Sequence, residues 1–193
     1  SAPRTAQMGH GARASQAVIT FADAIQIKGH GTRAIAAVAT GGPNTMGVLI
    51  LPMSTVYIVQ SFVAQLVGGG ERDEAPRFAW YGLAIAAAAG VLAAVLIPAV
   101  APVLSWTSYS PELQREMGDY MQLRLLSVAA AVGVEALGNW YGGLGNTWMQ
   151  MIAGLITMVA AIACKAIFIP SYGVDGAAIG SVIATWLGFL FLL

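Results

Sequence analysis

The 193-residue chain is 58% hydrophobic and only 9% charged. Soluble domains usually carry about a quarter charged residues, so this composition predicts a membrane protein and argues against a water-soluble domain. Nine basic and nine acidic residues cancel, which leaves no electrostatic case for binding nucleic acid. The single cysteine, Cys164, excludes an intrachain disulfide and a cysteine-based zinc site.

The N-terminal region is atypical for a membrane protein. Residues 1–16 are polar and carry no signal-peptide pattern. Residues 17–27 are apolar, but this run is too short to cross a bilayer, which takes about 20 helical residues. We therefore expect a polar segment over 1–16, followed by a truncated first helix that opens a helical bundle over 17–193.

Long charge-free stretches predict the next spans. Charged side chains are absent from 34–70, 78–111 and 136–164, and each of these stretches can cross a bilayer as a helix. The first predicts a helix over 35–67, bent at Gly41-Gly42-Pro43 and at Pro52, and a polar loop over 68–74. The second predicts a helix over 77–106.

Aromatic pairs mark the two ends of the helix over 77–106. Trp80 and Tyr81 lie near its start, and Trp106 and Tyr109 lie at its end. Such residues are enriched at both membrane interfaces. About 26 residues at 1.5 Å each separate the pairs by roughly 39 Å, which is the thickness of a bilayer with its headgroups.

Three further helices are expected in the second half of the chain. They cover 111–141, 147–169 and a last segment that begins near Asp175 and is still apolar at Leu193. The sequence Gly142–Asn146 predicts a turn, and Pro170-Ser171-Tyr172-Gly173 predicts a break. The predicted fold is therefore all-α, a polytopic bundle of about five full spans plus the truncated helix, incomplete at both ends.

Polar residues within the spans are the candidates for function, because burying them in lipid is costly unless a partner or a water-filled cavity compensates. One stripe on the helix over 35–67 holds Ser54, Tyr57, Ser61 and Gln65, at helical spacing. This stripe fits cavity lining and interhelical hydrogen bonding equally well.

A second polar face and two isolated charges complete the set. Tyr120, Arg124, Ser127 and Glu135 share one face of the helix over 111–141, and Glu135 is either a cavity residue or a structural acid. Asp23 in the truncated helix can bind a proton or a sodium ion, or can lie solvated at the interface. Lys165 can extend to the interface, or can neutralise Asp23 or Glu135.

Enzymatic signals are weak. His10 and His30 have no partners at metal-ligand spacing, and the chain has no nucleophile elbow or Walker loop. Residues 68–70, three glycines, follow a membrane helix and so indicate a loop. The sequence from Gly176 to Gly180 indicates close helix packing. We expect no enzymatic activity, no cofactor and no metal site.

Several segments together resemble the multidrug and toxic compound extrusion (MATE) family. The segments that carry the resemblance span about 21–193 in order; they are Phe21-Ala22-Asp23, 34–38, 61–68, Gly143-Leu144-Gly145-Asn146-Thr147, Met151-Ile152-Ala153-Gly154, 173–180 and Ala184-Thr185. The resemblance implies one six-helix lobe, the N-terminal one, of a twelve-helix transporter in the cell (inner) membrane. Its partners would be the lipid bilayer, a C-terminal lobe and small cationic or amphipathic substrates.

The resemblance also implies roles for individual residues. Such transporters export drugs by alternating access, driven by sodium or proton flow. Asp23 matches the family's first-helix acid, a proposed cation site, while Tyr120 and Glu135 match positions that face the same cavity. Lys165 departs from the family, which usually has Asn or Asp there, and Ala161 replaces an Asn one turn earlier. A lysine would place positive charge at the expected cation site.

Two alternatives to a drug antiporter remain open from the sequence. A flippase for lipid-linked saccharides predicts a more cationic cavity, which Arg124 and Lys165 support. A non-transporting membrane subunit predicts partner binding through small-residue faces. The charge distribution does not orient the chain, because basic residues occur in similar numbers on both sides of the predicted membrane.

Overall fold

The computed structural model describes residues 32–193, and this part of the chain is helical with no strands. The predictions for 1–16, for the truncated first helix and for Asp23 lie outside the described residues. The elements are, in chain order, α2 (Thr32–Val56), α3 (Ile58–Gly69), the 3₁₀ turn η2 (Arg72–Glu74), α4 (Ala75–Leu96), the 3₁₀ turn η3 (Ile97–Ala99), α5 (Val100–Ser105), α6 (Pro111–Leu125), α7 (Val128–Gly143) and α8 (Thr147–Leu192).

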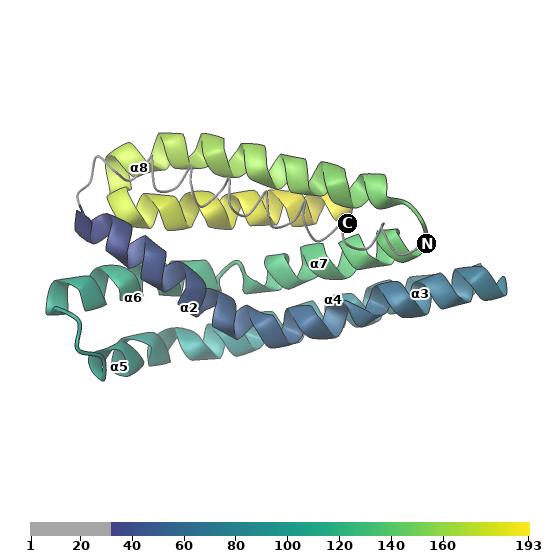
Figure 1. Ribbon diagram of the computed structural model, residues 1–193, viewed down its shortest axis with the longest axis horizontal. Coiled ribbons are helices and arrows are strands. Elements are labelled where there is room, and N and C mark those ends of the chain that lie inside the picture. Colours follow the sequence, from purple (N-terminus) through teal and green to yellow (C-terminus); the bar gives the residue numbers. More distant parts are fainter. Residues whose placement is uncertain (1–31) are drawn as a thin grey trace, which may run out of the picture.

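These helices supply the membrane spans that the sequence predicts. Within the described residues, three are long and apolar enough to cross a bilayer, over Leu49–Gly69, Arg72–Ser105 and Thr147–Leu192. The pair α6 and α7 forms a fourth span if the two bent helices count as one. Helix α8 has 46 residues and folds at Gly173 into two arms that run side by side (Figure 1).

A glycine makes the hairpin of α8 possible. Gly173 has φ 56° and ψ −125°, a conformation that side chains with a Cβ rarely adopt. The break predicted at Pro170–Gly173 is therefore confirmed, and the last helix begins next to Asp175 as expected. Beyond the hairpin, Gly176 and Gly180 lie directly against the first arm, so the two backbones approach closely.

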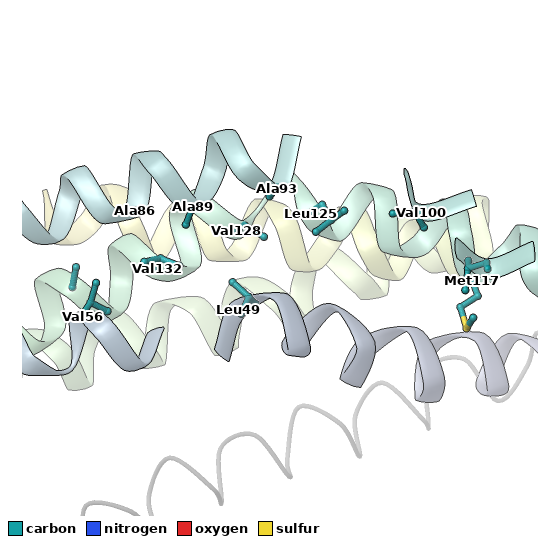
Figure 2. Packing of buried hydrophobic residues seen from close by; sticks show 12 residues of the cluster. Leu49, Val56, Ala86, Ala89, Ala93, Val100, Met117, Leu125, Val128 and Val132 are labelled. Carbon is teal, nitrogen blue, oxygen red and sulfur yellow. The ribbon is translucent and has the colours of Figure 1, made fainter. Parts of the chain in front are cut away.

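Helix α7 is the centre of the bundle. It packs against α4 on one side and against α8 on the other, and α2 and α3 also contact it. The largest core cluster joins α2, α4, α5, α6 and α7, with Val56 from α2, Ala89 from α4 and Val132 from α7 meeting between the helices (Figure 2). Small residues allow this close approach, since an added Cβ at Gly82 would lie 2.8 Å from Ala136 Cβ.

The helix predicted over 35–67 is formed by α2 and α3, and the crossing over Leu49–Gly69 runs through both. Helix α2 contains both Pro43 and Pro52, and Tyr57, between α2 and α3, keeps helical angles of φ −58° and ψ −30°. Just before it, the Ser54 and Thr55 hydroxyls donate to the carbonyls of Ile50 and Leu51. Both hydroxyls therefore bond to the preceding turn of their own helix, as serine and threonine within helices commonly do.

Interruptions also divide the next two spans, which the sequence predicts as single helices. The 3₁₀ turn η3, with Pro98, separates α4 from α5, because proline cannot donate a helical hydrogen bond. Helices α6 and α7 meet at a 45° bend over Leu126 and Ser127. There Leu126 N–H and Ser127 N–H donate to carbonyls three residues back, at 3.1 and 3.0 Å, which tightens the last turn of α6.

Candidate functional site

Lys165 is the most deeply buried charged residue that the structure describes. It lies on the first arm of α8 and is 3% exposed. An added Cβ at Gly180 would lie 2.9 Å from Lys165 Cγ, so the second arm of α8 covers the aliphatic stem. The lysine does not extend to the interface, which was one of the two sequence alternatives. A buried ammonium group needs a polar environment, so this position is a candidate functional site.

Tyr120 lies on α6 beside the same part of α8. Its ring is 4% exposed and packs against Ile169, which is one helical turn beyond Lys165. Helix α2 closes over the ring at Gly41, where an added Cβ would lie 3.0 Å from Tyr120 Cδ1. Three elements, α2, α6 and α8, therefore enclose Tyr120, and its partner Ile169 lies one turn from Lys165 on α8.

Arg124 follows Tyr120 by one turn on α6. Its Nε atom is buried and has no hydrogen-bond partner among the described residues. The neighbouring Ser127 hydroxyl donates to the Arg124 carbonyl at 2.8 Å, within the tightened turn between α6 and α7. Arg124 is half-buried as a whole, and it adds a second positive charge to the lobe besides Lys165.

Glu135 lies on α7, in a different part of the bundle from Lys165. Its side chain is partly buried, and its carboxylate interacts electrostatically with the hydroxyl of Tyr57, the residue between α2 and α3. Asn139, one turn later and 1% exposed, donates its side-chain amide to the Glu135 carbonyl at 2.7 Å. The structure therefore brings together Glu135 and Tyr57, which are 78 positions apart in the sequence.

The predicted polar stripe on α2 and α3 lies on the outside of the lobe. Ser54, Tyr57, Ser61 and Gln65 are all exposed, and Tyr57 is 56% exposed. Their helical spacing does place them on one side, but within the described residues no helix covers that side. Of these four residues, only Tyr57 interacts with a partly buried charge, which is the carboxylate of Glu135.

Sequence reasoning missed an acidic group at the hairpin end of the lobe. The carboxylates of Glu116 and Asp119, both on α6, interact electrostatically with the carboxylate of Asp175, which follows the Gly173 hairpin. No spacing rule connects α6 with the second arm of α8, so only the folded structure shows this proximity. Among residues 32–193, no group of three or more His, Cys, Asp or Glu side chains is arranged to hold a metal ion.

Together these features define a class of protein. Apolar helices of membrane length enclose a lysine, an arginine and a partly buried glutamate, which is an arrangement typical of transporter interiors. The chain is a multi-pass protein of the cell membrane, as the sequence predicts.

Comparison with known proteins identifies the family. The MatE family model matches residues 11–167, more than half of the chain. The chain is 27% identical over 192 residues to "Probable multidrug resistance protein NorM" of Neisseria meningitidis, and it is 24% identical over 189 residues to "Multidrug resistance protein MdtK" of Klebsiella pneumoniae. Each alignment covers 94% of this chain and 41% of the relative.

Solved structures share the fold. A MOP superfamily transporter from Pyrococcus furiosus, described as having a binding pocket of reverse polarity, superimposes with a TM-score of 0.86 at 23% identity. That alignment covers 93% of this chain and 40% of the solved one. An inward-facing multidrug resistance MATE family transporter gives a TM-score of 0.84, also at 23% identity, over 92% of this chain and 41% of its own.

The chain belongs to the MATE family, which confirms the resemblance found in the sequence. It spans about two fifths of the length of the curated relatives it matches. This coverage fits the predicted single lobe of a two-lobe protein.

Proposed function

We propose that this chain forms the N-terminal lobe of a cation-coupled antiporter that exports cationic or amphipathic compounds. Family membership and the names of the relatives, which describe multidrug resistance proteins, support a transport role. On this proposal the lobe acts with a C-terminal lobe, because alternating access needs two units that move against each other.

The observation that carries the proposal is the set of ionisable side chains inside the lobe. Lys165 is buried in α8, and Glu135 is partly buried in α7 next to Tyr57. Charges at membrane depth are expensive and usually mark ion or substrate pathways. They need a functional explanation here, because simple packing of the helices would be served by apolar residues.

The proposal assigns separate roles to these residues. Asp23 would bind the coupling ion, either a proton or sodium, and Tyr120, Glu135 and Lys165 would set the charge of the cavity. Ser61 and Gln65 are exposed on the isolated lobe, so they would line a cavity only where the second lobe faces them. No step of this scheme requires a cofactor or catalytic residue.

The test uses the complete transporter with both lobes, reconstituted in proteoliposomes. Uptake of ethidium would be measured under an imposed proton gradient or sodium gradient. We expect Asp23→Asn to abolish the ion dependence and Glu135→Gln to reduce transport, while Asp73→Asn in the exposed η2 turn leaves both unchanged. Unchanged efflux and ion dependence in Asp23→Asn would overturn the proposal.

The basic interior favours one further candidate, a flippase-like transporter for anionic lipid-linked compounds. Lys165 is buried and Arg124 has a buried Nε atom, so the lobe holds two partly or fully enclosed positive charges. A reverse-polarity pocket is described for the Pyrococcus furiosus transporter of the same fold. In this case Lys165→Met would reduce the flipping of a fluorescent anionic lipid and leave ethidium efflux unaffected, whereas the antiporter proposal predicts an effect on ethidium.

A further inference from the structure

Between η3 and α6, where Leu123 packs against the cluster around Tyr120, lies an open groove of about 410 Å³. Five side chains line it. Three of them are apolar and two are polar, and they are Ile97, Leu123, Leu126, Asp119 and Gln122. The groove therefore combines an apolar wall with one carboxylate and one amide.

The groove opens on the flank of the lobe. The opposite side of α6 is buried, since Met117 and Tyr120 pack inward next to Gly41 of α2. In contrast, Asp119 is exposed and Leu126 is 52% exposed. Val95 and Val103, on the neighbouring α4 and α5, are also more than half exposed. In a membrane protein such apolar side chains contact lipid.

The composition of α6 places the groove near the headgroups. Five of its fifteen residues are charged, whereas the α7 half of the same bent span has one charge, Glu135. Charged side chains avoid the centre of the hydrocarbon region, so α6 crosses the interfacial half of the bilayer. An occupant of the groove would have a polar group beside α6 and apolar chains toward the bend at Leu126.

The charge of the groove selects a cation. Asp119 forms no ion pair or hydrogen bond with any residue that the structure describes. Glu74, at the start of α4, differs in this respect because it is paired with Arg77. The charges that act on Asp175 at this end, from Asp119 and Glu116, are both negative. The exposed Arg115 lies one turn before Asp119 on α6 and adds the positive charge that a phosphate group prefers.

We propose that this groove binds a phospholipid with a primary ammonium headgroup, of the phosphatidylethanolamine type. The ammonium group donates hydrogen bonds to the Asp119 carboxylate and to the side-chain oxygen of Gln122. One acyl chain lies along Ile97, Leu123 and Leu126. Phosphatidylcholine has the same net charge but no N–H donor, and phosphatidylglycerol is anionic, so both fit the groove less well.

The test is lipid binding to the full chain, purified in detergent and measured by native mass spectrometry. Lipids with identical acyl chains and ethanolamine, choline or glycerol headgroups would be titrated separately. We expect the ethanolamine lipid to bind tightest, and Asp119→Asn to weaken its binding about tenfold, the effect of losing one charge-assisted hydrogen bond. Binding of the choline lipid should be unchanged by the same substitution.

The matched control is Asp73→Asn. Asp73 lines a second open groove at the opposite end of α4, so it tests for a general effect of removing one exposed acid. Equal affinity for ethanolamine and choline lipids, tighter binding of the glycerol lipid, or no effect of Asp119→Asn would overturn the proposal. So would displacement of the ethanolamine lipid by tetraphenylphosphonium in an Asp119-dependent manner, which would assign the groove to an exported cation.

Discussion

Gly180→Ala tests whether the two arms of α8 pack as closely as the structure indicates. The added Cβ would lie 2.9 Å from both Cγ and the backbone N of Lys165, and 3.2 Å from the backbone carbon of Cys164. Real Cβ atoms essentially never show contacts under 3.0 Å, and the contact of 3.2 Å is also tight. A rotamer change of the lysine relieves only the first of them, so the arms must move apart.

The size of the effect follows from two opposing terms. Overpacking a closely packed interface costs about 1–3 kcal/mol. Alanine recovers up to about 1 kcal/mol over glycine within a helix. With the full recovery the net destabilisation is up to about 2 kcal/mol, which lowers the midpoint of thermal unfolding by up to roughly 8 °C for a chain of this size.

The assay is thermal unfolding in detergent, followed by circular dichroism. The matched control is Gly154→Ala, on the first arm of the same helix, where an added Cβ meets no atom within 4 Å. This variant should keep its unfolding temperature or gain from alanine's helix preference. If Gly180→Ala and Gly154→Ala have the same unfolding temperature, the close approach of the arms at Lys165 is refuted.

Two further substitutions test other features of the bundle. Gly173→Ala should destabilise the hairpin of α8 by about 1–3 kcal/mol, because its φ of 56° strains any residue with a Cβ. The control is Gly42→Ala, where an added Cβ meets no atom within 4 Å and should not destabilise the chain. Equal unfolding temperatures of the two variants would contradict this account. Trp186→Phe removes the hydrogen bond from its indole N–H to the Leu126 carbonyl, 3.3 Å long, and should cost about 0.5–1.5 kcal/mol. The control is Trp148→Phe, which should be neutral because Trp148 is exposed. An equal loss of stability in both variants would show that the Trp186–Leu126 hydrogen bond contributes nothing.

Local sequence features determined the number and order of the spans. Charge-free stretches of membrane length predict helices whatever their neighbours are, because an unpaired backbone in lipid must satisfy its own hydrogen bonds. The break before Asp175 was also predictable from local sequence, since Pro170 and Gly173 change the conformation of the backbone at their own positions. Close packing at Gly176 and Gly180 was also predictable, because only small residues let helices approach so closely.

Tertiary contacts decided where the spans bend and which polar groups meet. At the bend between α6 and α7, the Leu126 carbonyl accepts a hydrogen bond from the indole N–H of Trp186, which is 60 positions away in the sequence. Likewise, neither Glu135 beside Tyr57 nor Asp175 beside Asp119 can be found from spacing. Helical periodicity shows which residues share a face, but only the packing of the helices shows what that face contacts. For this reason the stripe through Ser61 was predictable as a stripe, whereas its exposure required the structure.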